Sequence, residues 1–197
     1  MRVSQLQIQV ELEGAKAWLQ PADETRPVLL LNDGAPELSV SGIGFHGAVI
    51  VNCSAPCPTY TLEHCAFSGH NFTATPTSAS PGGGLRVHSG RINVRSTSFS
   101  FLAALDGGAL TLETSAAEVI ISTSTFSHNT ATRHGGAILV RGGNLTMDMV
   151  TVTRNEAGEK GGGLYVAGGA VFLMNQSVLQ MNTARQTSCG GGPCGGS

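Results

Sequence analysis

The chain has 197 residues, of which only 12% are charged and 5% are aromatic, and its formal net charge is −2. The 11 lysine and arginine residues are scattered, so no basic surface for nucleic acid is expected. No segment is apolar over the ~20 residues that a membrane-spanning helix needs. The 27 glycines, about twice the usual share, indicate a β-rich chain with a core of small aliphatic side chains packed close to backbone.

The chain is interpreted as a single domain over residues 1–187, followed by a Gly/Cys-rich tail. Apolar residues alternate with polar ones at Leu6, Ile8, Val10 and Leu12, which predicts a strand rather than a secretory signal. Residues 1–37 are expected to form an irregular first coil or N-terminal cap, and residues 38–81 less regular coils. Residues 82–187 are expected to form regular coils, and residues 188–197 the truncated start of a further coil.

The five cysteines form two groups whose spacing does not suit a zinc site. We expect Cys53–Cys57 and Cys189–Cys194 to be local disulfides, with Cys65 buried. Four Asn-x-Ser/Thr sequons add to this pattern, and they would accept glycans only in a eukaryotic secretory pathway. Together these features favour an extracellular or cell-surface location. The sequons lie at Asn52, Asn71, Asn144 and Asn175.

An apolar anchor position recurs along the chain, and from Phe67 onward a Gly-Gly strand start follows each anchor. Because no helical segment lies between these units, the order predicts an all-β solenoid of about six coils, with 26–28 residues per coil in the C-terminal half. The anchors are Phe45, Phe67, Phe99, Phe126, Val152 and Leu179.

Alternation within each strand predicts columns of like residues stacked from coil to coil. One inward column is expected to end Val119, Leu145, Phe172 and the next Ile121, Met147, Met174. The outward column is expected to be polar throughout. It reads Glu63, Arg95, Ser122, Asp148 and Asn175.

An asparagine lies three residues after the anchor at Asn129, Asn155 and Asn182. Asparagine suits a turn, and stacked asparagines are predicted to bond one another as an internal structural ladder. Paired glycines, at Gly107–Gly108 and Gly135–Gly136, allow positive φ and close backbone approach at a corner. No helix follows any of these pairs, so a dinucleotide site is not expected, and no cofactor is predicted.

These motifs resemble the paired F-x-x-N and G-G-A-I/L/V motifs of the polymorphic membrane protein repeats of chlamydial surface autotransporters. Phe126 to Asn129 gives the first motif, and Gly135, Gly136, Ala137 and Ile138 give the second; Gly107–Gly108 begins another G-G-A match. The resemblance covers roughly residues 82–187. It implies a right-handed parallel β-helix of the pectin-lyase-like superfamily, displayed at a cell surface and adhesive in the bacterial members.

Catalytic and metal sites are not predicted. A two-carboxylate hydrolase needs its acid and base roughly 5–10 Å apart. Of the four aspartates, Asp33 and Asp106 precede glycine as turn residues, and Asp148 has its nearest acid three coils away in its column. The six histidines are expected in different columns or loops. We find no carboxylate cluster for calcium.

We therefore expect a non-catalytic surface scaffold that binds protein or glycan ligands and continues into further coils of a longer parent chain. One alternative is a carbohydrate-active β-helix enzyme, a lyase or hydrolase. The weaker alternative is ice binding through a Ser/Thr ladder, which thermal hysteresis would reveal. The ladder comprises Ser98/Ser100, Thr125/Ser127 and Thr151/Thr153 and stops at Val178/Gln180; the possible binding face combines Thr125, Ser127, Thr151 and Thr153 with Arg95, Asp148 and Asn175.

Overall fold

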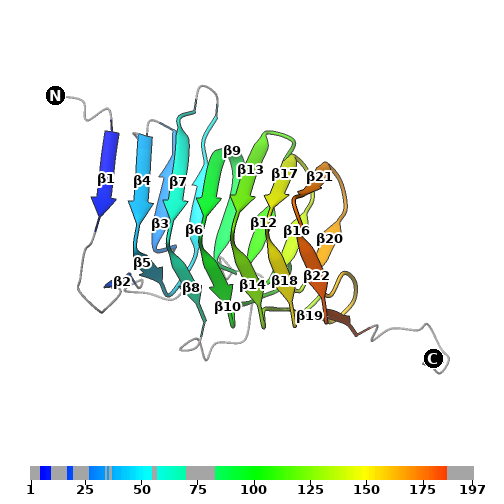
Figure 1. Cartoon of the computed structure of the whole chain (residues 1–197). Helices are drawn as coiled ribbons and strands as arrows, with labels where there is room; N and C mark the ends of the chain where they lie inside the picture. The colour runs from blue at the N-terminus through cyan, green and yellow to red at the C-terminus, as the bar shows by residue number, and fades with distance from the viewer. Residues whose placement is uncertain are drawn as a thin grey trace.

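A computed structural model of the chain describes residues 5–9, 17–19, 27–33, 35, 37–54, 57–69 and 83–185. In these ranges the regular elements are strands, which stack side by side in successive coils along one axis (Figure 1). The all-β parallel solenoid predicted from the sequence is confirmed. None of the described residues forms a helix long and apolar enough to cross a membrane. The tail, including Cys189 and Cys194, lies outside the described residues, as do residues 70–82.

Each complete coil contributes strands to several faces, and every strand pairs in parallel with its counterpart one coil away. Sheet A comprises β1 (Gln5–Gln9), β4 (Glu37–Ser41), β7 (Thr59–Glu63), β9 (Leu85–Arg95), β13 (Ala117–Ser122), β17 (Asn144–Asp148) and β21 (Ala170–Met174). Sheet B comprises β2 (Ala17–Leu19), β5 (Ile43–Phe45), β8 (Ala66–Ser68), β10 (Ser98–Ser100), β14 (Thr125–Ser127), β18 (Thr151–Thr153) and β22 (Val178–Gln180).

Two further faces close the coil. Sheet C comprises β3 (Leu29–Asn32), β6 (Val49–Asn52), the first half of β9, β12 (Leu110–Leu112), β16 (Ile138–Val140) and β20 (Leu164–Val166). Sheet D is short and comprises β11 (Ala103–Ala104), β15 (Thr130–Ala131), β19 (Glu156–Ala157) and β23 (Thr183–Ala184). Because β9 runs through the corner without a break, it joins sheets A and C. Sheet B has seven strands, one more than the six coils expected, because β1 and β2 add a rung at the N-terminal end.

The core is built from the predicted anchor column. Phe45, Phe67, Phe99 and Phe126 are fully buried, and their rings stack with centroids 4.7, 4.6 and 4.5 Å apart. These distances are close to the strand spacing of ~4.8 Å, so the rings repeat once per coil. Val152 continues the column. The stack therefore fixes the register of one coil on the next through side chains as well as through backbone hydrogen bonds.

The corners between the faces need left-handed backbone. One residue with positive φ follows sheet A in each regular coil, at Ser96, Thr123 and Met149. In the last coil two consecutive residues take this conformation, Asn175 and Gln176, because the corner is one residue longer.

This extra residue corrects the predicted columns of the last coil. Leu145 pairs with Val171 and Met147 with Leu173, so Phe172 and Met174 are not the inward residues. Met174, rather than Asn175, pairs with Asp148. Counting back from the anchor Leu179 at a fixed offset placed the extra residue before β21, whereas it lies at the corner after β21.

Candidate functional site

The three asparagines form a ladder inside the coils, beneath the corner between sheets B and D. The Nδ2 of Asn129 donates to Oδ1 of Asn155 at 3.0 Å, and the Nδ2 of Asn155 donates to Oδ1 of Asn182 at 2.9 Å. Each Nδ2 of Asn129 and Asn155 also donates to a buried carbonyl, that of Phe99 or of Phe126. The backbone N–H of Asn129 donates to Oδ1 of Asn155 at 2.9 Å. The ladder thus satisfies buried polar groups from two coils at every rung.

The paired glycines lie where the chain turns from sheet D towards sheet C. Gly107 and Gly135 have φ of 59° and 65°, which side chains rarely adopt. At the second glycine of each pair the neighbouring coil leaves no room: a Cβ on Gly136 would lie 1.9 Å from the carbonyl oxygen of Gly162. The repeat motif is therefore explained by backbone geometry.

The predicted hydroxyl face lies on the outside of sheet B. Ser98, Thr125 and Thr151 pair in one column, and Ser100, Ser127 and Thr153 in the other. Both columns continue into the last coil as Val178 and Gln180. The Oγ1 of Thr153 is buried, so this column is less accessible than the first. The result is a flat face without charged residues in these two columns, to which each coil contributes one strand.

Arg95 and Asp148 border this face where sheet A ends. Arg95 pairs with Ser122, and Ser122 pairs with Asp148, so the two charged residues are two coils apart. The Oδ1 of Asp148 is buried and has no hydrogen-bond partner in the described part of the chain. Asn175 occupies the corner after β21 and is not in this column, which removes it from the predicted row.

An aromatic pair that sequence reasoning missed borders the opposite edge of the face. Phe101 and His128, the residues that follow β10 and β14, stack with ring centroids 5.0 Å apart. Phe101 is 43% exposed although it is a large apolar residue. Both residues have positive φ, which directs their side chains away from the core columns. The signal in the sequence was the residue after each Ser-Phe-Ser or Thr-Phe-Ser triplet, where an apolar or aromatic residue has no core position.

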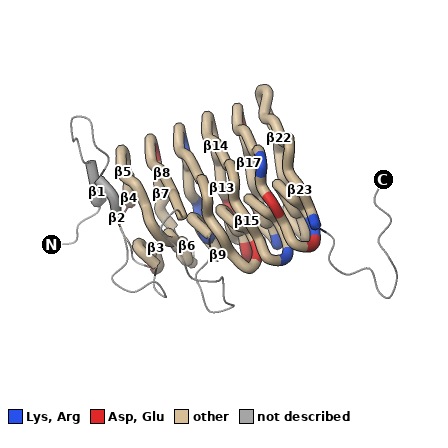
Figure 2. Tube along the Cα trace, turned by 90° about the horizontal axis from the view of Figure 1, so that it is seen from below, with Lys and Arg blue, Asp and Glu red and all other residues tan. Residues whose placement is uncertain are grey.

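A second group of side chains gathers where the turns enter and leave sheet C. Figure 2 shows Asp, Glu, Lys and Arg along the edge of the solenoid that carries β9, β15 and β23. Arg141 contacts two carboxylates with its two terminal nitrogens: Nη2 lies 2.7 Å from Asp106 and Nη1 lies 2.9 Å from Glu113. Arg133 also binds Asp106, and Arg86 binds Glu113 at 2.9 Å. These residues come from three neighbouring coils.

His134 extends this charged network to a further coil. Its Nδ1 lies 3.1 Å from Oδ1 of Asp106, and its Nε2 lies 3.1 Å from Oε2 of Glu159. Only the doubly protonated ring donates to both carboxylates. Tyr165 stacks on the same ring, with centroids 5.0 Å apart. Sequence reasoning did not bring Asp106, Glu113 and His134 together, so it missed this network.

The two central carboxylates are held in the ionised form. Burial would raise the pKa of Asp106, but hydrogen bonds from Arg133 and His134 and the charge of Arg133 outweigh it, so the pKa lies below its ordinary value of 3.8. Burial would also raise the pKa of Glu113. The hydrogen bonds and positive charges of Arg141 and Arg86 outweigh this effect, so the pKa is lowered from 4.5. A general acid needs a raised pKa. These carboxylates are thus poorly suited to donate a proton near neutral pH.

No grouping of three or more His, Cys, Asp or Glu side chains suited to a metal ion occurs within the described ranges. The carboxylates of the network face guanidinium groups, which compete directly with a cation. Asp106 and Glu113 side chains are 7% and 11% exposed, so little of either is open to a ligand. The ion pairs of the network thus join side chains of neighbouring coils.

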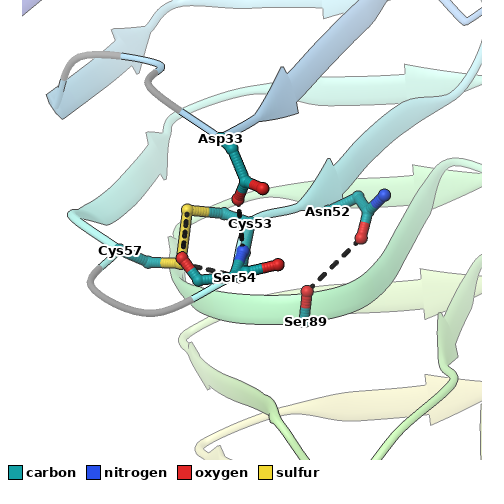
Figure 3. Close-up of a disulfide and its surroundings, with 6 residues drawn as sticks. All are labelled: Asp33, Asn52, Cys53, Ser54, Cys57 and Ser89. Carbon is teal, nitrogen blue, oxygen red and sulfur yellow. Dashed lines mark hydrogen bonds between the residues drawn. A yellow bond between two sulfur atoms is a disulfide. The ribbon is translucent and has the colours of Figure 1, made fainter.

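A disulfide joins Cys53 and Cys57 just after β6 (Figure 3). The loop is anchored by the backbone N–H of Ser54, which donates to Oδ1 of Asp33 at 2.5 Å. Beside it lies an open cavity of about 450 Å³ whose lining includes Ser89 and Arg91. The Nε of Arg91 is 2.7 Å from Glu118, so the one charged group of the lining is already paired. Cys65 lies apart from this loop and is buried.

Residues 123–141 match the model of the Chlamydia polymorphic membrane protein repeat. The matched segment runs from the corner before β14 to the residue after β16 and contains Phe126, Asn129 and the Gly135–Gly136 pair. The resemblance recognised in the sequence is confirmed over this segment. No curated protein and no solved structure matches the chain.

Proposed function

We propose that the chain is a surface-displayed β-helix module that binds protein or glycan ligands on its outer face and carries out no catalysis. The repeat match supports the surface location, since the family bears the name of a membrane protein. The observation that carries the binding role is the flat hydroxyl face of sheet B, bordered by the exposed stack of Phe101 on His128.

The chemistry of this face suits glycans and protein loops. Hydroxyl groups donate and accept hydrogen bonds, and they adapt to either kind of polar ligand. An exposed aromatic ring beside them supplies apolar contact to a sugar face or to a side chain. Because the coils repeat in register, the same pair of positions is presented several times along the axis, which favours an extended ligand.

The enzyme alternative finds little support in the charged network. Asp106 and Glu113 share one guanidinium, and both have lowered pKa values. A retaining or inverting glycosidase needs one carboxyl group that stays protonated near neutral pH. The ice-binding alternative is supported only by three coils of mixed Ser and Thr, since the columns end in Val178 and Gln180.

A binding assay with matched variants tests the proposal. The chain is offered to immobilised neutral, uronic and sulfated polysaccharides and to extracellular-matrix proteins. We expect retention on at least one of these, and a loss of at least tenfold in Thr125→Lys, which places a charge on the hydroxyl face. The control is Ile120→Lys on sheet A, where Ile120 is 43% exposed. Equal retention of both variants would contradict the assignment to sheet B, and retention on none of the probes would contradict the binding role.

A further inference from the structure

The sequon asparagines and the ladder asparagines fall into separate structural classes. Among the described residues, the sequon side chains of Asn52, Asn144 and Asn175 are exposed. Asn129 and Asn155, which the interior depends on, are buried and belong to no sequon, because alanine occupies the position two residues after each. A glycan on any exposed sequon would therefore leave the ladder intact.

Asn144 and Asn175 lie at opposite ends of sheet A in neighbouring coils. Asn144 is the first residue of β17, and its backbone pairs with Glu118 and Ala170. Asn175 lies at the corner after β21, with φ of 39°, on the longer turn of the last coil. The side chains leave the coil from its outer surface at both places. A glycan at either position would extend into solvent and would not disturb strand pairing.

Asn52 differs from these two sites. The middle residue of its sequon, Cys53, is bonded to Cys57, and the third, Ser54, is held by Asp33. The Oγ of Ser89 also donates to the side-chain oxygen of Asn52 at 3.4 Å (Figure 3). The glycosyltransferase needs an extended sequon, and closure of the disulfide during folding prevents this conformation. We therefore do not expect Asn52 to be glycosylated.

We propose that Asn144 and Asn175 are N-glycosylation sites. The disulfide between Cys53 and Cys57 indicates an oxidising compartment, where this modification takes place. The assignment shares the surface location with the proposed function, but it does not depend on ligand binding by sheet B.

The reaction is a group transfer that needs no oxidant or reductant. The Asn Nδ2 forms a bond to the anomeric carbon of an oligosaccharide carried on a lipid pyrophosphate. The bond from that carbon to the phosphate oxygen breaks, the lipid pyrophosphate leaves with the bonding electrons, and Nδ2 loses one proton. The hydroxyl groups that complete the two sequons belong to Thr146 and Ser177.

The decisive sample is the chain purified from its own cells, with the chain secreted from cultured eukaryotic cells as a second sample. Peptide N-glycosidase in heavy-oxygen water converts each glycosylated asparagine to labelled aspartate, which peptide mass spectrometry locates. We expect the label at both Asn144 and Asn175 in both samples. An unlabelled Asn144 or Asn175 in either sample overturns the proposal. Any chain retained inside the cultured cells is mapped in the same way, so that poor secretion does not hide a modified site.

Variants of the third sequon position separate the modification from general folding effects. Thr146→Ala is expected to abolish the label at Asn144 and to leave that at Asn175, whereas Thr146→Ser keeps both. Loss of the label from both sites in Thr146→Ala, or its persistence at Asn144, contradicts recognition of the sequon. Because the readout is the glycan, it is independent of the polysaccharide-binding assay: glycosylated chain that binds no ligand would contradict only the proposed function.

Discussion

Two polar assemblies cross the coils of this molecule, and they differ in almost every physical respect. The asparagine ladder is buried, neutral and repeated at one fixed offset from the anchor residue. The charged network at sheet C is partly exposed and joins residues at unequal offsets from their anchors. Both assemblies connect neighbouring coils. They differ in that the positions of the ladder residues follow the sequence repeat, whereas those of the network residues do not.

The comparison shows which interactions a solenoid uses to set its register. Loss of one asparagine from the buried column leaves its hydrogen-bond partners unsatisfied, and each such group lowers the free energy of unfolding by about 1–3 kcal/mol. Exposed ion pairs contribute about 0–1 kcal/mol and can be lost from a coil with little effect. We expect the ladder to hold the register, while the network stabilises only the turns that it joins.

The largest expected effect is at the centre of the ladder. Asn155→Ala removes hydrogen bonds to the backbone N–H and the side-chain amide of Asn129 and to the carbonyl of Phe126. We expect the free energy of unfolding to fall by about 3 kcal/mol, since several buried groups lose their partner. Urea denaturation measures it. Asn182→Ala, in the half-exposed last rung, is expected to cost roughly 1 kcal/mol; an equal loss would show that the ladder does not act through burial.

The next effect is at the guanidinium that joins the two buried carboxylates. Arg141→Met removes the ion pairs with both Asp106 and Glu113. We expect this to lower the free energy of unfolding by about 1.5 kcal/mol. Arg185→Met is the control, because its pair with Glu156 is exposed and is expected to cost at most about 1 kcal/mol. The two variants are compared by urea denaturation, and a larger loss in Arg185→Met would show that the network does not stabilise the turns that it joins.

The same carboxylates predict the pH dependence of stability. Their pKa values are lower in the folded chain than the ordinary 3.8 of Asp106 and 4.5 of Glu113. Their contribution is therefore complete above these ordinary values and is lost as the pH falls through the lowered ones. Thermal unfolding between pH 6 and 3 should show a shallower decline in the Asp106→Asn variant, after allowance for its lower starting stability. An equally steep decline in that variant would contradict the lowered pKa of Asp106.

The smallest effect on stability is expected on the outer faces. Thr125→Lys and Ile120→Lys replace exposed side chains on sheets B and A, so each should change the free energy of unfolding by no more than about 0.5 kcal/mol. Thermal unfolding of the two variants checks this. A loss of several kcal/mol in either one would mean that its effect on ligand retention reports damage to the fold.

The interior of the coils was predictable from the sequence because it repeats. The anchor Phe126, Asn129 three residues later and the Gly135–Gly136 pair have fixed spacing, and a fixed spacing places residues in columns. The charged network was not predictable in this way: Asp106 and Glu113 lie in turns on either side of one short strand, and Arg141 reaches both from the next coil. Side-chain reach across coils leaves no periodic signal.

The error at Asn175 has a similar origin. A corner that is one residue longer shifts the strand before it by one position, which turns every side chain of that strand to the other face. The anchor spacing of 27 residues before Leu179 equals that before Phe126, so it does not reveal where the extra residue lies. Only the pairing of Met174 with Asp148 locates the insertion.

Counting new chain ends tests whether the module binds polysaccharide without cleaving it. Neutral and uronic polysaccharides are incubated with the chain in the presence of calcium, and reducing and unsaturated ends are quantified alongside the fraction of polymer bound. We expect polymer to be bound and no new ends to form. New ends that appear with the wild-type chain and disappear in Asp106→Asn would contradict it and would make the charged edge of sheet C an active site.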